Sequence, residues 1–391
     1  MWRKRGVLPE APAAADQVAP PSSSAAWTGW REFRVIRREF EDASYTQCSF
    51  YLAPVDGVSL PPFRPGQFLT FWLEVANARS EGGVGVHTVT RCYSLSDTPE
   101  STSYRVTIKR VIAPIDRPDL PAGASSSHFH DRVQEGDVLR LKAPSGHFCI
   151  DPDASVPAVL IAGGIGITPM MSMLRWCLAE QPGRRVNLYF GLRNGDEHPF
   201  KHQLEQLASL HPHFHLTMVY SRPGPTDVIG RDYNAVGHID IELLRRTLPH
   251  GRHRFYVCGP AAMMASLVPA IIDWGVPEQD LHYEAFGPAS VHIARILPET
   301  PPPILATAVE VHFQRSGRTL AWEGRDESLL EFAERHGIVV DSGCRSGSCG
   351  TCETKLISGT VHYTHEPDHD VVPGHCLLCV CTPRSTLVLE A

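Results

Sequence analysis

The sequence contains no run of apolar residues near the roughly 18 that a membrane-spanning helix needs. It also has no excess of positive charge, because 36 Lys and Arg stand against 43 Asp and Glu, for a net charge of -7. Nucleic-acid binding therefore has little support, since no basic stripe is available to neutralise phosphates. No apolar stretch follows the basic start MWRKR, so a secretory signal is not indicated. We expect a monomeric cytoplasmic protein with neither a membrane nor a nucleic-acid partner.

Histidine patterns typical of a single-metal site are also missing. The 20 histidines are scattered, with no His-Glu-x-x-His motif or other paired spacing. Cysteine, by contrast, is concentrated at one end, where six of the 11 cysteines lie from Cys344 onward. In a cytoplasmic chain such clustering more often holds a metal or cluster than forms disulfides. Four other cysteines are interpreted as inert buried thiols, namely Cys48, Cys92, Cys149 and Cys177.

The 391 residues are enough for two or three domains. Residues 1–28 are rich in Ala, Pro and Ser and predict a disordered tail. In residues 29–152, short β-type runs such as QFLTFWLEV alternate with Pro and Gly turns, a pattern typical of an antiparallel β-barrel.

From residue 153 the pattern becomes apolar strand, glycine turn, helix, as in AVLIA, GGIGITP and MMSMLRWCLAE. Residues 153–288 therefore predict an α/β domain with a parallel, doubly wound sheet and a ligand at the carboxyl ends of its strands. Residues 289–305 form a Pro-rich linker, expected to be stiff. Residues 306–391 begin with a predicted hairpin and a helix, and the clustered cysteines follow.

The run CRSGSCGTC has the C-x4-C-x2-C spacing of a plant-type [2Fe-2S] site, whose fourth thiolate comes from further along the chain. These three ligands would be Cys344, Cys349 and Cys352. In HCLLCVCTP we favour Cys379 as the fourth, with Cys376 and Cys381 as alternatives. Small residues between the cysteines let the loop wrap a cluster and turn N–H groups toward its sulfurs. Structural zinc is the competing interpretation, but it usually uses paired C-x2-4-C knuckles.

The cysteine segment resembles the plant-type ferredoxins, in which C-x4-C-x2-C and a later L-x-C-V are the ligand signature. This resemblance covers residues 306–391 and implies a β-grasp fold. Twelve acidic residues against seven basic ones lie in this segment. Its surface could therefore dock a basic partner, or it could simply be a solvated acidic surface.

Two motifs in residues 29–152 suit a nucleotide with a planar ring. In RCYS, an arginine can bind phosphate, a tyrosine can stack on a ring and a serine can reach a ring nitrogen; these are Arg91, Tyr93 and Ser94. In GASSSHFH, a helix start with free N–H groups and hydroxyls can receive a pyrophosphate. Its residues are Gly123, Ser125 and Ser126, and simple helix capping by the serines is the alternative.

GGIGITP lies between a buried strand and a helix, and its glycines would allow the phosphates of a dinucleotide to approach. The residues concerned are Gly163, Gly164, Gly166 and Thr168. The motif is not the ordinary G-x-G-x-x-G fingerprint. Further along, Ser221 and Arg222 follow a strand and can receive a 2'-phosphate, which favours NADPH over NADH unless Arg222 is only a surface charge.

Together with CGP and HYEAFGP, these motifs resemble the ferredoxin-NADP reductase superfamily, especially the reductase part of flavohaemoproteins, from about Trp30 to Pro288. The resemblance implies an FAD-binding β-barrel followed by a nicotinamide-binding domain, and GASSS favours FAD over FMN. It places Arg91, Tyr93 and Ser94 at the flavin and Ser126 at its pyrophosphate. It also places Thr168, Cys258 and Gly259 near the nicotinamide, and Glu284 and Phe286 close to the flavin.

These features predict an NAD(P)H-dependent reductase that passes electrons through FAD and a [2Fe-2S] cluster to a partner protein, an oxygenase component. Protein groups would position the cofactors rather than react, with Ser94, Cys258 and Glu284 nearest the chemistry. Two alternatives remain. One is a flavin reductase for small acceptors with a regulatory or zinc-binding C-terminal module, and the other is an electron chain serving a different iron-sulfur enzyme.

Overall fold

The computed structural model describes residues 27–78, 84–99, 102–113, 122–286, 309–324, 328–345, 347, 349–364, 367 and 369–391. The predicted linker, and the predicted tail up to residue 26, lie outside the described residues. Among these residues, no helix combines the length and apolar character needed to cross a membrane.

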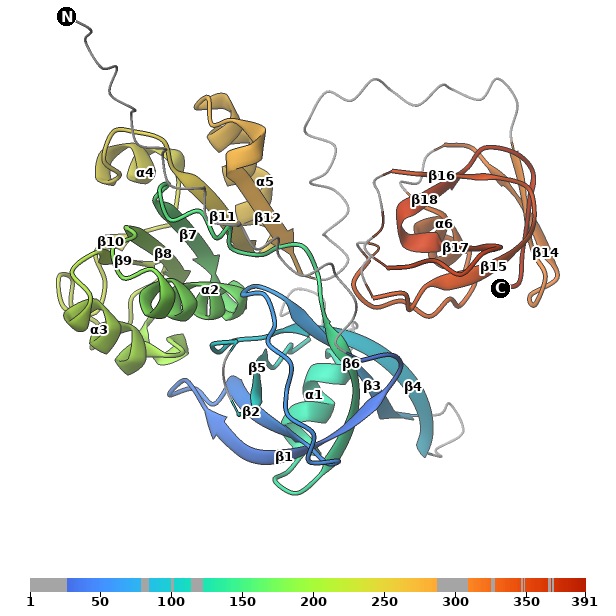
Figure 1. Cartoon of the computed structure of the whole chain (residues 1–391), viewed down its shortest axis with the longest axis horizontal. Coiled ribbons are helices and arrows are strands. Elements are labelled where there is room, and N and C mark those ends of the chain that lie inside the picture. Colours follow the sequence, from blue (N-terminus) through green and yellow to red (C-terminus); the bar gives the residue numbers. More distant parts are fainter. Residues whose placement is uncertain are drawn as a thin grey trace, which may run out of the picture.

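The first sheet is antiparallel and six-stranded, in the order β4-β3-β6-β1-β2-β5 (Figure 1). A bridge between Leu95 and Val106 joins the end of β4 to β5 and closes the sheet. Alternation along β3 explains the core, because Leu69 and Phe71 point into it while Thr70 points to the other face. Helix α1 adds the buried Phe129 to this core. The elements are β1 (Arg31–Phe40), β2 (Gln47–Pro54), β3 (Phe68–Ala78), β4 (Val84–Ser94), β5 (Tyr104–Lys109), α1 (Ala124–Asp131) and β6 (Val138–Ser145).

The second sheet is parallel, in the order β10-β9-β8-β7-β11-β12. Its central strands are fully buried runs, and separate apolar cores on its two faces are completed by α2 with α3 and by α4 with α5. The strand order reverses between β7 and β11, which is where such sheets bind ligands. The elements are β7 (Ala158–Gly163), α2 (Ile167–Glu180), β8 (Val186–Leu192), α3 (Lys201–Leu210), β9 (Phe214–Tyr220), β10 (Ala235–Val236), α4 (Ile241–Thr247), β11 (Arg254–Gly259), α5 (Ala261–Asp273) and β12 (Leu281–Ala285).

The third unit is a mixed five-stranded sheet, in the order β14-β13-β19-β15-β17, with a separate β16-β18 pair. The predicted hairpin is β13 with β14, and the predicted helix is α6. Ser328 caps α6 by accepting a bond from the N–H of Glu331 at 3.2 Å. The elements are β13 (Val309–Phe313), β14 (Arg318–Trp322), α6 (Leu329–Arg335), β15 (Glu353–Ser358), β16 (Val361–Tyr363), β17 (His375–Leu377), β18 (Cys381–Pro383) and β19 (Leu387–Leu389).

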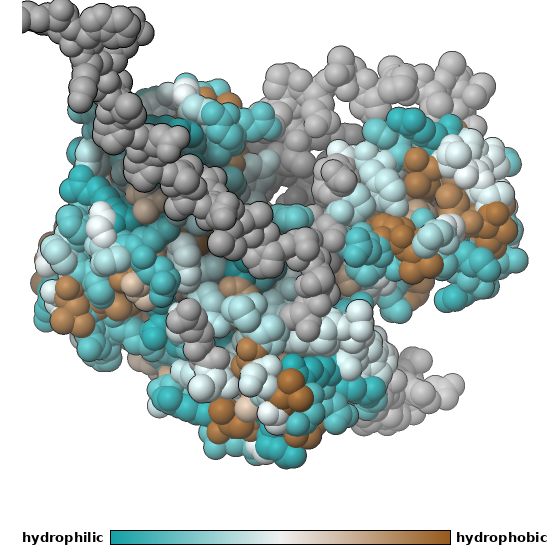
Figure 2. Space-filling model, in the orientation of Figure 1, coloured by the Kyte–Doolittle hydropathy of each residue, from teal (hydrophilic) through white to brown (hydrophobic). Residues whose placement is uncertain are grey.

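The predicted fold class, an antiparallel barrel, a parallel α/β domain and a ferredoxin-like domain, is confirmed. The face shown in Figure 2 is mostly hydrophilic, with small separate hydrophobic patches.

Candidate functional site

The four predicted cluster ligands gather in two pairs. Cys344 and Cys349 are joined by reciprocal bonds, in which the N–H of each donates to the sulfur of the other at 3.3 Å. Cys352 and Cys379 form the second pair through a thiol hydrogen bond, which lowers the pKa of Cys352 below its usual value. The charge of Cys344 acts to raise the pKa of both thiols of the second pair. Two thiol pairs match the number of ligands that two irons need, since each iron takes two thiolates.

The alternative fourth ligands face elsewhere. Cys376 and Cys381 are fully buried and hydrogen-bond to each other. Cys379 lies between them in sequence, on the 3-10 turn Leu378–Val380, and turns toward Cys352 instead. Within the described part of the chain, no three His, Cys, Asp or Glu side chains converge closely enough for a single metal ion. The pairing of Cys379 with Cys352 agrees with the choice of Cys379 as the fourth ligand, which stays a prediction.

The cysteine loop bends through left-handed backbone. Gly350 has φ +68°, and a Cβ there would lie 2.4 Å from the ring of His369, so only glycine fits. Arg345 has φ +58° and is held by an ion pair in which it donates to Glu334 of α6 at 3.0 Å. These contacts fix the path of the loop around the thiols.

Strand β4 carries the three residues predicted at the flavin. The ring of Tyr93 packs edge-on against Phe129, with ring centroids 5.2 Å apart. Burial raises the pKa of Tyr93 well above its usual value, so the phenol stays neutral. Ser94 is buried, whereas Arg91 is exposed and donates to the carbonyl of Thr90 at 2.7 Å. One strand thus presents a ring, a hydroxyl and a cation in sequence.

At the start of α1, the two serines predicted at the pyrophosphate differ in their hydrogen bonding. The Ser126 hydroxyl donates to the carbonyl of Gly123 at 3.0 Å and accepts from the N–H of Val111 at 3.1 Å. The Ser125 hydroxyl is buried and has no partner among the described residues. Neither serine caps the helix, since its N-cap is Gly123 without a side-chain bond. A phosphate oxygen would supply the partner that Ser125 lacks, so this helix start fits a pyrophosphate.

The glycine turn brings the ends of β7 and β11 together. A Cβ on Gly166 would lie 2.2 Å from the carbonyl oxygen of Cys258, and one on Gly259 would lie 3.0 Å from the nitrogen of Gly163. Gly164 has φ +53°. The Thr168 hydroxyl donates to the carbonyl of Ile165 at 3.1 Å, so it is already engaged. This compact turn lies at the point where the strand order reverses.

Cys258 and Glu284 are in register on the adjacent strands β11 and β12. Burial raises the pKa of the Cys258 thiol well above its usual value. Burial, with the nearby charge of Cys344, raises the pKa of Glu284 to about 8. The Oε2 atom of Glu284 is buried without a hydrogen-bond partner among the described residues. Phe286 follows β12 and is partly exposed.

Ser221 and Arg222 follow β9 at the same edge of the sheet. Their N–H groups donate to Leu192 and Arg193 at 2.9 and 2.8 Å, and the Arg222 side chain is exposed. Asp227, which the sequence did not single out, accepts from the N–H of Gly224 at 2.7 Å. Because this carboxylate already accepts a backbone hydrogen bond, it gives no independent sign of how the nucleotide ribose is recognised. NADPH preference stays a prediction.

The structure also brings two unpredicted residues to the cysteine loop. Lys142 on β6 donates to the carbonyl of Cys349 at 3.1 Å. Cys92 on β4 is within hydrogen-bonding reach of the Cys349 thiol and is not fully buried. Cys92 is therefore not the buried thiol that the sequence predicts, and its inertness stays a prediction. No sequence signal could have found these contacts, because they join segments more than 200 residues apart.

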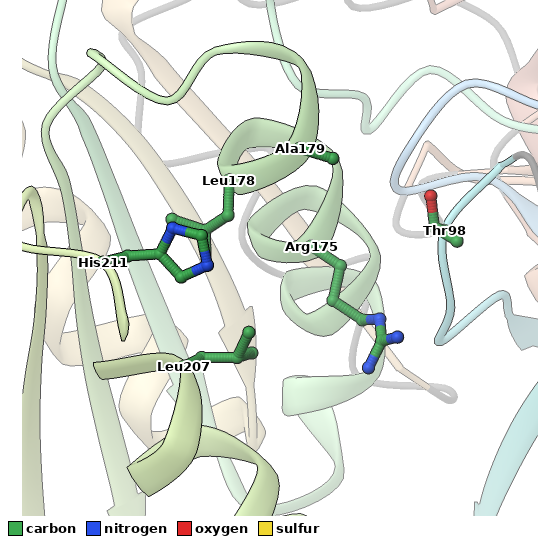
Figure 3. Close-up of a pocket in the computed structure, with 6 residues that line it drawn as sticks. All are labelled: Thr98, Arg175, Leu178, Ala179, Leu207 and His211. Atoms are coloured by element: carbon green, nitrogen blue, oxygen red, sulfur yellow. The ribbon is translucent and has the colours of Figure 1, made fainter. Parts of the chain in front are cut away.

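A separate cavity of about 330 Å³ lies beside α2 and α3. Figure 3 shows that His211 and Leu207 line one side and that Arg175 and Thr98 lie on the other. Arg175 forms an ion pair with Asp97 at 3.0 Å. None of the predicted site residues lines this cavity.

Two family models match the chain. Residues 160–268 match the oxidoreductase NAD-binding domain, and residues 311–384 match the 2Fe-2S iron-sulfur cluster binding domain. A flavohemoprotein of Halalkalibacterium halodurans is 39% identical over 264 residues, which is 67% of this chain and 61% of the relative. The chain thus spans less than two thirds of the length of such relatives.

Solved structures extend the likeness. The FAD/NAD binding domain of nitric oxide dioxygenase from Vibrio cholerae is 29% identical with a TM-score of 0.55, and covers 66% of this chain and 99% of its own. Phthalate dioxygenase reductase, described as a modular structure for electron transfer from pyridine nucleotides to [2Fe-2S], is 26% identical with a TM-score of 0.52. This match covers 93% of the present chain and 98% of the reductase.

The chain thus contains an oxidoreductase NAD-binding domain in a module of the ferredoxin-NADP reductase type, followed by a C-terminal 2Fe-2S iron-sulfur cluster binding domain. More particularly, it has the modular architecture of phthalate dioxygenase reductase. The predicted cofactor set of FAD, a nicotinamide nucleotide and a [2Fe-2S] cluster is confirmed at the level of these domains.

Proposed function

We propose that this protein is an NAD(P)H-dependent electron-transfer reductase that delivers electrons, through FAD and a [2Fe-2S] cluster, to an oxygenase component. Bound in their sites, these groups would supply two-electron acceptance and single-electron delivery. The observation that carries the proposal is the contact between the cysteine loop and the barrel that bears the flavin motif, with Lys142 on Cys349 at 3.1 Å.

The chain's own residues position the flavin. We infer that Tyr93 and Ser94 line the ring and that Arg91 binds its phosphates. At the start of α1, free N–H groups and the unpartnered Ser125 hydroxyl receive the pyrophosphate. This assignment moves the hydroxyl contact from Ser126 to Ser125.

The nicotinamide would enter at the edge formed by the glycine turn and the end of β11. The neutral thiol of Cys258 adds no charge beside the ring. Glu284 holds a proton near neutral pH, because its pKa is about 8, and its unpartnered Oε2 is available for a hydrogen bond. Ser221 and Arg222 remain the proposed contacts for a 2'-phosphate.

The oxygenase partner is inferred from likeness to phthalate dioxygenase reductase, whose architecture this chain shares. The acidic balance of residues 306–391 suits docking to a basic surface. The alternative of a flavin reductase for small acceptors would not need the cysteine loop to contact the barrel.

Composition of the purified protein tests the proposal. We expect FAD, two irons with acid-labile sulfide, and nicotinamide-dependent reduction of cytochrome c that is lost in Cys344→Ser. Zinc in place of iron, or full cytochrome c reduction by Cys344→Ser, would contradict it.

A further inference from the structure

A polar row crosses three neighbouring strands of the barrel. Thr70 on β3 is in register with Cys92 on β4 and with Lys142 on β6. Residues in register on neighbouring strands share one face of the sheet. The flanking residues Leu69 and Phe71 point into the barrel core, so this row lies on the outer face. Nevertheless, Thr70 is completely buried, which means that something covers the outer face here.

The covering element is the cysteine loop. Lys142 donates to the backbone carbonyl of Cys349, and Cys92 approaches the thiol of the same residue. A Cβ on Gly343 would lie 2.9 Å from the Cys349 sulfur and 3.5 Å from the Cys92 sulfur. A side chain at position 343 would therefore crowd both thiols, and the glycine keeps their approach open.

Cys92 also belongs to the flavin strand. Its sequence neighbours are Arg91 and Tyr93, whose side chains alternate to the other face of β4. Its sulfur is oriented from behind by the Thr70 hydroxyl at 3.4 Å. One residue thus lies between the proposed flavin contacts and a proposed cluster ligand.

We propose that Cys92 is a positioning residue that couples the two redox sites, its thiol donating a hydrogen bond to the sulfur of Cys349. Lys142 assists by holding the carbonyl of the same ligand. A donor to a ligand sulfur stabilises the more negative, reduced cluster and so raises its reduction potential. The inference rests on the proposed function and gives Cys92 a specific role where the barrel meets the cysteine loop.

The test compares Cys92→Ala with Cys92→Ser, which retains a donor, in the complete protein loaded with flavin and iron. Cys48→Ala is the matched control, because Cys48 is a buried thiol of the same barrel on the distant strand β2. The readouts are the cluster midpoint potential, the Fe–S stretching bands in resonance Raman spectra, and the rate of cluster reduction after flavin reduction.

We expect Cys92→Ala to lower the midpoint potential, shift the Fe–S bands and slow cluster reduction about tenfold, the loss of one hydrogen bond to a charged group. Cys92→Ser should recover most of each effect, and Cys48→Ala should change none. Lys142→Met should slow transfer as well, with normal flavin content.

Native values in Cys92→Ala, with normal flavin and iron content, would overturn the inference while leaving the proposed function intact. If Cys92→Ala does not accumulate, the donor-free variant Cys92→Val takes its place with the same expected results, and a native potential, native Fe–S bands and a native rate of cluster reduction in that variant would overturn the inference as well. Failure of the native protein to reduce its cluster at all would instead refute the proposed function.

Discussion

Replacing the candidate fourth ligands one at a time gives a sharp prediction about the cluster. Cys379→Ser removes a thiol that hydrogen-bonds to Cys352, and leaves three of the four sulfurs that two irons require. We expect iron to fall from two per chain to below one and the visible cluster bands to disappear.

The neighbouring cysteines should behave differently. Cys376 and Cys381 are fully buried and bonded to each other, so serine at either position places a hydroxyl in an apolar core. This costs about 1 kcal/mol or more. For a domain of this size that cost lowers the melting temperature by roughly 4–8 °C. Iron content at room temperature should stay at two.

Iron and sulfide analysis with visible spectra of the three serine variants provides the assay, and thermal unfolding followed by circular dichroism gives the stability. Full iron in Cys379→Ser, together with iron loss in Cys376→Ser or Cys381→Ser, would refute the ligand assignment.

Three further predictions concern the other two domains. Ser125→Ala should weaken FAD binding about tenfold, because a phosphate loses a hydroxyl partner, and flavin release on dilution measures this. Ser126→Ala should mainly lower stability. Equal flavin retention in Ser125→Ala and the native chain would contradict the prediction. Gly166→Ala should lower thermal stability by about 1–3 kcal/mol, because its Cβ would meet a carbonyl at 2.2 Å, and an unchanged melting curve would be the opposing result. Arg252 donates to the carboxylate of buried Asp280 at 2.7 Å and holds the pKa of Asp280 below its usual value. The ionised carboxylate therefore stabilises the fold at pH values above its unfolded pKa of about 3.9. This contribution is lost as the pH falls through the lower pKa of the folded state. Asp280→Asn should therefore cost about 1–3 kcal/mol at pH 7 and less in acid, checked by urea unfolding at several pH values, and a constant difference from pH 7 to pH 3 would count against it.

Much of the architecture could be predicted from local patterns. Alternating runs such as QFLTFWLEV specify a half-buried antiparallel strand, and AVLIA before a glycine turn specifies a buried parallel one. The C-x4-C-x2-C spacing is itself a local feature, and it predicts the 2Fe-2S domain that residues 311–384 match.

Finer details depended on packing. Whether Ser125 or Ser126 has a free hydroxyl is decided by bonds to Val111, which lies outside the motif. The contact of Cys92 with the cysteine loop depends on the register of β3 with β4 and on how two distant domains meet. Neither fact leaves a pattern in the sequence, because each joins residues that are separated along the chain.

Electron transfer from the nicotinamide through the flavin to the cluster can be followed by anaerobic titration with NADH and NADPH in separate experiments, recording the flavin and cluster absorption bands. We expect one nucleotide to bleach the flavin and the cluster bands to bleach in the same titration. Bleaching of the flavin while the cluster stays oxidised, or no bleaching by either nucleotide, would contradict it.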